Sequence, residues 1–215
     1  MTLKIKTLIT LLFISSHLFA QSDGASKNIL SALSKKFKTY DVVKVDFTLS
    51  INNAEAKTKE NQSGVLYLKS KANKYKIVLA EQEILSDGKS QWTYLKADNE
   101  VQLSNVSKAD DALNPAQIFT DYDKGYKTKY NGDSKTDNTV YQNIELVPTA
   151  TRSFFKIKMM VNKAKKQLYS MAIYDKNGNI YTYTIKTLSA ATGISDVFFV
   201  WDKKKFAGVD IQDLR

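Results

Sequence analysis

The sequence predicts a mainly β fold of the α+β class, with about eleven antiparallel strands in a barrel or a strongly curved sheet. Three observations predict it. Apolar and polar residues alternate with a period of two along most of the chain. Asp87-Gly88 and Asn177-Gly178 are strong hairpin-turn signals between such segments. One amphipathic helix precedes the first strand. Curvature or closure is favoured because both limit exposed strand edges.

The first twenty residues are expected to be a secretory signal peptide rather than part of the fold. Lys4 and Lys6 form a positive start, an apolar run covers Leu8 to Ile14, and Leu18-Phe-Ala20 ends in a small residue. The apolar run is shorter than the roughly 20 residues that span a bilayer. The chain has no Cys for a lipid anchor. We therefore expect cleavage before Gln21 and export to the periplasm.

Residues 21–215 are expected to form a single domain, because no linker, repeat or low-complexity run interrupts them. The net charge of the whole chain is +10, and nearly all of its positive charge is lysine. Arg152 and Arg215 are the only arginines. Nucleic-acid proteins usually use arginine forks, so we expect no nucleic-acid partner and interpret the lysines as a solvated surface. We expect a monomer.

An enzyme is not expected. The only His is His17, inside the predicted signal, and there is no Cys. Triads built on His and the His/Cys sites that zinc prefers are therefore excluded after cleavage. The paired carboxylates Asp110-Asp111 and Asp121/Asp123 suit helix starts as well as acid–base chemistry, and no positioned partner is evident. We therefore expect no metal and no cofactor.

The elements follow in order. Ile29, Leu30, Leu33 and Phe37 recur at helical spacing, with Asp23 or Ser26 as the cap. Residues 107–120 break the β pattern and suggest short helical pieces, with Pro115 in a first turn. Residues 52–61 are polar and suggest a turn, and 207–215 either pack on the sheet or fray. The expected strands lie near 43–51, 64–69, 75–79, 84–85, 92–94, 101–103, 140–147, 154–161, 168–174, 181–185 and 197–201.

Five segments, in order along the chain, resemble the LolA family of periplasmic lipoprotein carriers. They are Val45-Asp-Phe47-Thr48, Gln62-Ser-Gly64-Val-Leu-Tyr67-Leu-Lys69, Ser86-Asp-Gly-Lys89 with Trp92-Thr-Tyr94, Asn114-Pro-Ala-Gln117, and Phe198-Phe-Val-Trp201 with Gly208-Val-Asp210.

The resemblance implies an unclosed antiparallel barrel whose helical lid covers an apolar cavity. It implies a chaperone that binds lipoprotein acyl chains, receives them from an ATP-driven inner-membrane exporter and delivers them to an outer-membrane acceptor. From the strand pattern and the resemblance together, the expected cavity lining is Val45, Phe47, Leu49, Tyr67, Ile77, Leu79, Trp92 and Tyr94. The expected lid residues are Leu113, Pro115, Ile118 and Phe119.

Two points stay open in the sequence. The family often has Arg-Pro after the second strand, where this chain has Ser70-Lys71, so Lys71 is the candidate latch to the lid. An alternative function is the same fold binding a free lipid or a glycolipid, or sensing a mislocalised lipoprotein, because the fold does not name the ligand. A hydrolase working through Asp or Lys is a third hypothesis.

Overall fold

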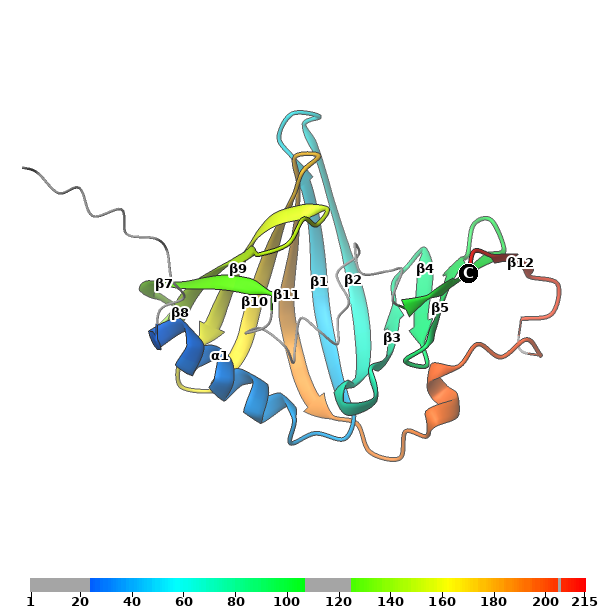
Figure 1. Ribbon diagram of the computed structural model, residues 1–215, viewed down its shortest axis with the longest axis horizontal. Helices are drawn as coiled ribbons and strands as arrows, with labels where there is room; N and C mark the ends of the chain where they lie inside the picture. The colour runs from blue at the N-terminus through cyan, green and yellow to red at the C-terminus, as the bar shows by residue number, and fades with distance from the viewer. Residues whose placement is uncertain (1–23, 107–124, 205) are drawn as a thin grey trace, which may run out of the picture.

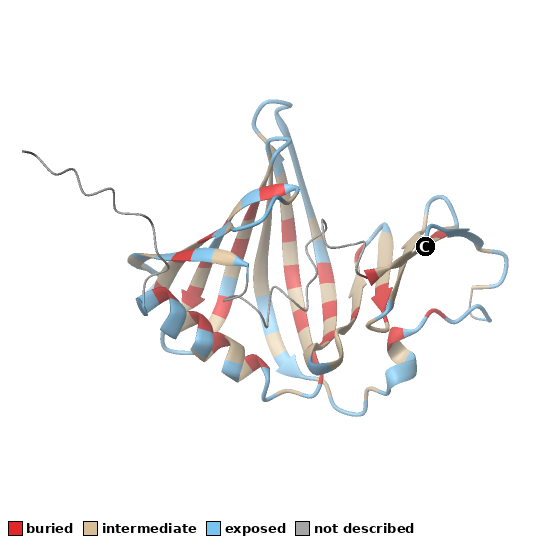
Figure 2. Cartoon of the chain, viewed as in Figure 1, coloured by how far each residue is buried: buried red, intermediate tan, exposed pale blue. Residues whose placement is uncertain are grey.

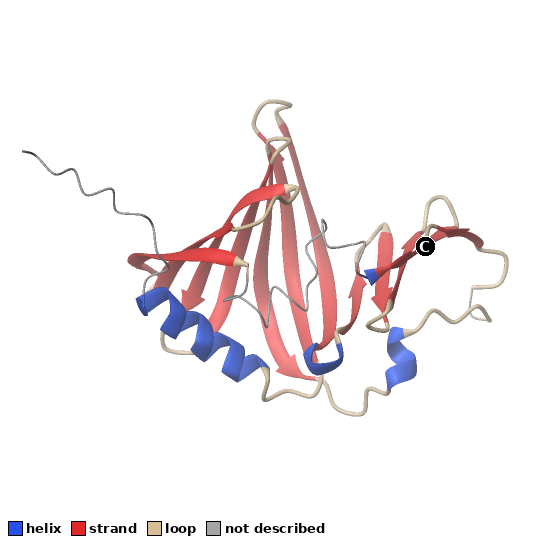
Figure 3. Ribbon diagram, viewed as in Figure 1, coloured by secondary structure: helices blue, strands red, loops and turns tan. Residues whose placement is uncertain are grey.

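The computed structural model describes residues 24–106, 125–204 and 206–215, which form one curved sheet with a helix across one face (Figures 1 and 3). The helix is α1 (Gly24–Phe37), and two short 3-10 helices are η1 (Ser70–Ala72) and η3 (Asp196–Phe199). The strands are β1 Val43–Asn53, β2 Thr58–Lys69, β3 Lys74–Val78, β4 Gln82–Ser86, β5 Ser90–Leu95, β6 Glu100–Asn105, β7 Tyr126–Thr136, β8 Thr139–Pro148, β9 Phe154–Asn162, β10 Gln167–Asp175, β11 Asn179–Ala190 and β12 Asp210–Asp213.

Two antiparallel meanders build this sheet. The order of the twelve described strands is β12-β6-β5-β4-β3-β2-β1-β11-β10-β9-β8-β7. Strands β1 to β6 pair with their sequence neighbours, as do β7 to β11, and the antiparallel pair β1–β11 joins the two halves. Strand β12 adds parallel to β6. Strands β7 and β12 are the two edges, so the mainly β, unclosed antiparallel architecture predicted from the sequence is confirmed.

Several element predictions were wrong in detail. Residues 197–201 do not form a strand, because Asp196–Phe199 is η3, in which the Phe198 ring meets Tyr67 while Phe199 is fully buried. Two strands were missed: β7, whose sequence is polar and lysine-rich, and β12 in the tail. The polar turn predicted at 52–61 is shorter, because β1 and β2 continue on either side of residues 54–57.

The N-terminal helix is where it was predicted, but its cap is not Ser26. Ser26 lies inside α1, is fully buried, and its hydroxyl is 2.7 Å from the Thr128 hydroxyl of β7. The other proposed cap, Asp23, lies outside the described residues, as do the predicted signal peptide and the helical insert. Within the parts of the chain described, no helix is long and apolar enough to cross a membrane.

We call the face of the sheet on which α1 packs the inner face and the opposite one the outer face. Leu30, Leu33 and Phe37 of α1 join the main core with inner side chains of β1, β2 and β8 to β10. Burial alternates along these strands, as the banding of Figure 2 shows. The main core is made of Leu30, Leu33, Phe37, Val43, Val45, Phe47, Leu49, Leu66, Leu68, Tyr75, Leu79, Ile144, Leu146, Phe154, Ile157, Met159, Val161, Leu168, Met171 and Ile173.

Gly64 makes room for an aromatic ring on the inner face. It pairs with Phe47 across β1 and β2. A Cβ at Gly64 would stand 2.5 Å from Phe47 Cζ and 2.6 Å from Leu79 Cδ2, closer than real Cβ atoms approach. The absence of a side chain therefore lets the Phe47 ring lie against β2. The ring then meets Tyr183 of β11, with 5.7 Å between the two ring centroids.

We expect Gly64→Ala to destabilise the fold by about 1–3 kcal/mol, because a methyl group forced into this packing displaces Phe47 and Leu79. Urea unfolding measures the loss. Gly24→Ala is the matched control, since nothing lies within 4 Å of a Cβ there. The double variant Phe47→Leu/Gly64→Ala should recover part of the lost unfolding free energy, because the smaller side chain leaves room for the methyl group. Equal stability of Gly64→Ala and the wild type would contradict the explanation.

Candidate functional site

The inner face of the sheet carries apolar side chains from β1 across to β4 and β11. Tyr75 lies opposite Leu68, and Val43 lies opposite Leu68 from the other side. Two residues further along β1, Val45 faces Leu66, which faces Ile77, which faces Ile84. On the other side of β1, Phe47 pairs with Ile185, and Leu49 pairs with Tyr183. These pairings make one continuous apolar surface across five strands.

Part of this surface is not fully buried, although it belongs to the core face. Several apolar or aromatic side chains pack against the main core and yet remain partly exposed. We call six of them, which lie on β1, β3, β4 and β11, the inner-face strip: Ile51, Ile77, Ile84, Tyr181, Tyr183 and Ile185. Apolar side chains of this kind offer contact area to an apolar ligand without any rearrangement of the sheet.

The tyrosines of the inner-face strip are neutral over the physiological pH range. Burial raises the pKa of Tyr183 to about 12. Burial also raises the pKa of Tyr181, and the nearby Asp175 carboxylate adds to the effect. Both phenols therefore stay protonated, which suits contact with hydrocarbon rather than with a charged ligand.

The structure brings together five of the eight predicted lining residues. Val45, Phe47, Leu49 and Leu79 are buried in the main core, and Ile77 belongs to the inner-face strip. Their role in binding stays a prediction. The neighbouring strip residues on β11, Tyr181, Tyr183 and Ile185, were recognised as a strand but not as lining, because no local signal indicates that β11 pairs with β1.

Tyr67, Trp92 and Tyr94 do not lie on this face. Tyr67 alternates with the inner residues Leu66 and Leu68, and its ring meets Phe198 of η3 at a centroid distance of 4.9 Å. Trp92 and Tyr94 belong to a second cluster. Alternation indicates that Trp92 and Tyr94 share a face. The register of the β4–β5 hairpin decides which face this is: Trp92 lies opposite the outward-facing Leu85, so both rings lie on the outer face.

The second cluster fastens the C-terminal segment to the outer face. Trp201 stacks on Phe206 with 4.1 Å between ring centroids, and Tyr94 lies 5.3 Å from Trp201. The whole outer cluster consists of Leu85, Val101 and Trp201, with Trp92, Tyr94, Phe206 and Val209 packed around them. Burying these aromatics holds the segment after β11, which runs past the β3 to β6 end of the sheet before β12 pairs with β6 (Figure 1).

The Ser86-Asp87-Gly88-Lys89 segment has a structural role. The Asp87 carboxylate accepts hydrogen bonds from the backbone N–H groups of Lys89 and Ser90, both at 2.8 Å. Gly88 has φ +94°, and a Cβ there would lie 2.6 Å from the Ala72 carbonyl oxygen. Ser86 is fully buried and accepts a bond from the Gly88 N–H at 3.1 Å. The predicted hairpin turn between β4 and β5 is therefore present, and it packs closely against Ala72 of η1.

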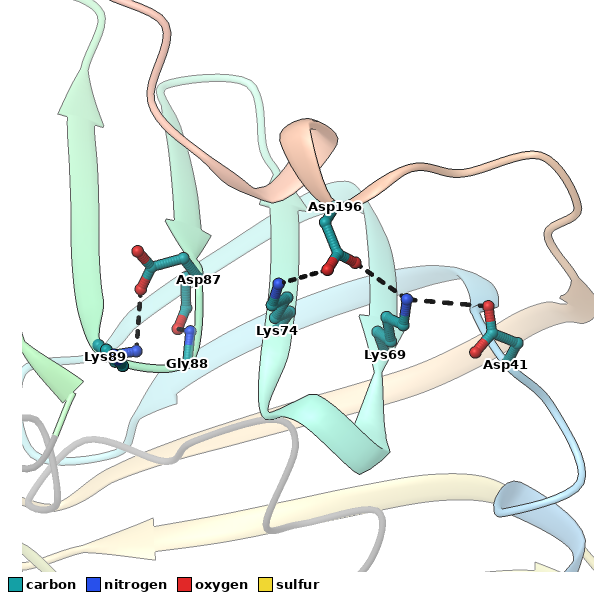
Figure 4. Close-up of polar contacts among 8 residues, drawn as sticks. Asp41, Lys69, Lys74, Asp87, Gly88, Lys89 and Asp196 are labelled. Carbon is teal, nitrogen blue, oxygen red and sulfur yellow. Dashed lines mark hydrogen bonds and ion pairs between the residues drawn. The ribbon is translucent and has the colours of Figure 1, made fainter.

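An ion-pair cluster ties η3 to the start of β3 and the end of β2 (Figure 4). Asp196 accepts from Lys69 Nζ at 2.9 Å and from Lys74 Nζ at 2.8 Å, one through each carboxylate oxygen. Lys69 also lies 4.0 Å from Asp41. The hydrogen bonds from Lys74 and Lys69 lower the pKa of Asp196 to about 2. This cluster holds the segment that leads from β11 to Trp201.

The roles of the latch and the lid stay predictions. Lys71 is exposed in η1 and makes no hydrogen bond or ion pair with the described residues. The predicted lid residues Leu113, Pro115, Ile118 and Phe119 lie outside the described part of the chain. Among the residues described, no group of three or more His, Cys, Asp or Glu side chains is placed to hold a metal ion.

Comparison with known families agrees with this architecture. A family described as "Outer membrane lipoprotein carrier protein LolA" matches residues 38–202, which is most of the chain. The chain belongs to the LolA family. The match runs from the end of α1 to Asp202, so it includes both meanders and the outer-cluster residue Trp201.

Solved structures resemble this fold at low sequence identity. An uncharacterized conserved protein from Thermus thermophilus has a TM-score of 0.55 at 10% identity, covering 88% of this chain and 99% of that one. A putative outer membrane lipoprotein-sorting protein domain from Vibrio parahaemolyticus gives 0.49 at 14%, with 84% and 99% covered. A LolA superfamily protein from Nitrosomonas europaea gives 0.47 at 13%, with 82% and 98% covered. A search of curated proteins found no matching sequence.

We expect the η3 ion pairs to weaken in acid. Because the pKa of Asp196 in the folded chain lies below its usual 3.8, the pairs contribute stability above about pH 4 and lose it as the pH falls toward 2. The chain has two tryptophans, and both lie in the outer cluster, so tryptophan emission reports on this segment. The wild type should shift to the red over this range, and Asp196→Asn should already be shifted at neutral pH.

Asp213→Asn is the control for this titration. The pKa of Asp213 is also lowered to about 2, but its partner Arg215 is two residues away and joins no distant segments. This variant should leave the emission unchanged at neutral pH. Identical emission from the wild type and Asp196→Asn at every pH would show that the ion pairs do not hold η3.

Proposed function

We propose that this chain is a periplasmic chaperone that binds the acyl chains of lipoproteins on its inner face and carries them from the inner to the outer membrane. Membership of the LolA family supports the class of function. The observation that carries the proposal for this chain is the inner-face strip, in which neutral apolar side chains remain partly exposed on a core face. We propose a binding protein and not an enzyme, with no cofactor.

The energetics of acyl binding favour such a surface over water. Each buried methylene group gains about 0.8 kcal/mol, so one long acyl chain gains roughly ten kcal/mol. The shape of the strip suits a linear chain, because Ile51 and Tyr181 lie opposite each other near the turns, while Leu49–Tyr183 and Phe47–Ile185 follow toward the sheet centre. An acyl chain laid along β1 and β11 would meet apolar side chains at each step.

The same energetics require partners on both sides of the transfer. A bilayer is as apolar as the strip, so moving a chain from lipid to protein gains close to nothing. Passive binding therefore holds cargo but does not extract it. We propose that an ATP-driven exporter in the inner membrane supplies the work, and that an outer-membrane acceptor with a better site takes the cargo. Export of the carrier itself would rely on the predicted signal peptide at residues 1–20.

Two adjacent residues on β3 provide a matched test. Ile77 is part of the inner-face strip, and Val78 is its partly buried neighbour on the outer face. We expect Ile77→Gln to reduce the acylated lipoprotein that copurifies with the carrier by about 5- to 150-fold, because a buried amide without partners costs about 1–3 kcal/mol. Val78→Gln should retain wild-type binding. Mass spectrometry of the purified complexes quantifies the cargo.

The same measurement separates the alternatives. If the wild-type protein copurifies with a protein-linked acyl chain, the carrier function is supported. If it copurifies with a free lipid or a glycolipid, the alternative binding function replaces the carrier proposal. Equal cargo on the Ile77→Gln and Val78→Gln variants, both folded by circular dichroism, would remove the inner face from the proposal.

A further inference from the structure

A patch on the outer face, on the side of the sheet opposite to the candidate site, combines exposed rings with lysines. Strands β7 to β10 lie at the opposite end of the sheet from η3 and β12 (Figure 1). Phe155 of β9 is 49% exposed, and its ring centroid is 6.2 Å from that of Tyr174 on β10. Val147 of β8 is 40% exposed nearby on the same outward-facing rows. Large apolar side chains that are exposed together often mark an interaction site.

Two lysines lie beside these rings, and two more lie on β7, two strands away from Phe155. Lys156 Nζ lies 4.6 Å from the Tyr174 ring centroid and 5.5 Å from that of Phe155, and Lys158 Nζ lies 5.6 Å from Tyr174. On β7, Lys127 lies opposite Val147 and Lys129 lies opposite Glu145. Lys127, Lys129 and Lys158 are exposed. We call Lys127, Lys129, Phe155, Lys156, Lys158 and Tyr174 the basic-aromatic patch.

A local irregularity in β9 produces the exposed ring. The register of β9 against β10 shifts between Lys156–Tyr174 and Phe154–Asp175, which leaves Phe155 as the extra residue. Phe154 is buried in the main core while Phe155 and Lys156 both project outward. A bulge of this kind redirects a side chain without breaking the sheet. It places the Phe155 ring beside the Lys156 ammonium group on the outer face of the sheet.

The charge of the patch is one-sided. Within the paired rows of β7 to β10 that contain these lysines, Glu145 is the single carboxylate, and it lies between Lys129 and Lys158. Four ammonium groups therefore face one carboxylate. Neighbouring strands are about 4.8 Å apart, so the patch is roughly 15 Å wide, which matches several lipid headgroups rather than one small anion.

We infer that the basic-aromatic patch docks the protein on an anionic phospholipid surface. Lysines close to such a surface are attracted to its negative potential. Phe155 and Tyr174 would lie at the headgroup boundary, where amphipathic and aromatic side chains are favoured, while the lysine stems cover them and their ammonium groups reach phosphates. The inference concerns a surface separate from the inner-face strip, so it stands whether or not the chain carries lipoproteins.

Vesicle binding tests the inference with protein purified from the periplasm of cells that express the full chain. We expect sedimentation with vesicles of phosphatidylglycerol and phosphatidylethanolamine, and little with phosphatidylcholine vesicles. Lys127→Gln/Lys129→Gln/Lys158→Gln should lower the partition coefficient about a hundredfold. The control Lys38→Gln/Lys57→Gln/Lys59→Gln removes the same charge from exposed lysines of other regions and should bind within about threefold of the wild type.

The ring is tested separately. Phe155→Trp should give an additional blue-shifted emission on anionic vesicles, because the introduced indole enters the headgroup region. The inference is overturned if the wild type does not sediment with anionic vesicles, if both triple variants lose binding equally, or if phosphatidylcholine vesicles bind as well. An acidic protein partner instead of lipid would give the first of these outcomes. Loss of lipoprotein cargo in Ile77→Gln with vesicle binding intact would separate the two proposals.

Discussion

The antiparallel pairing of β1 with β11 is the interaction on which the rest of the structure depends. It joins the first strand of the chain to the last strand of the second meander over the full length of β1, from Val43–Ala190 to Asn53–Asn179. Without it the chain would be two separate sheets, each with an open hydrophobic face. With it, Phe47, Leu49 and Ile51 gain Ile185, Tyr183 and Tyr181 as neighbours. The inner-face strip is therefore a product of a pairing between residues that are far apart in the sequence.

The two faces of the sheet are stabilised by different elements, and this separates structure from binding. On the inner face, α1 contacts β7 and β10, whereas the strip lies on β11, β1, β3 and β4. On the outer face, η3, Trp201 and the tail pack on β2 to β6 through rings and the Asp196 ion pairs. A ligand on the inner face would not need to displace the C-terminal segment, because β2 to β6 stand between them.

Sequence patterns predicted the parts of this fold that depend on neighbours in the chain. Alternation in Val43–Ile51 and the Asp87-Gly88 and Asn177-Gly178 turns were sufficient for strands and hairpins. They were insufficient for the side on which Trp92 and Tyr94 lie, because a strand's pattern fixes which residues share a face and only the register with its partners fixes which face that is. For the same reason Tyr67 was placed with Phe47, although it alternates with Leu66 and Leu68.

Other features required distant contacts. The aromatic run Phe198-Phe-Val-Trp201 has the composition of a strand, and the Asp196 ion pairs with Lys69 and Lys74, together with the Tyr67 ring, hold it as η3 instead. Strand β7 has a polar sequence, and its pairing with β8 together with its packing against α1 makes it a strand. The family fingerprint around Asp87 identified the family correctly, yet its residues fix a turn and an outer cluster rather than the surface proposed to bind cargo. Motif residues and the residues proposed to contact the ligand are thus different sets in this chain.

The geometry of the sheet also constrains how cargo could enter. The basic-aromatic patch and the inner-face strip lie on opposite faces of the sheet, so a protein docked through Lys127, Lys129 and Phe155 would not present the strip to the lipid surface. Direct exchange between bilayer and strip would then be hindered sterically, in addition to gaining almost no free energy. Docking of this kind would concentrate the carrier at a membrane while leaving loading to a protein partner that reaches the inner face. The proposed carriage and the proposed membrane docking are compatible on one sheet, because the apolar strip and the charged patch lie on opposite faces and would not compete for the same lipid.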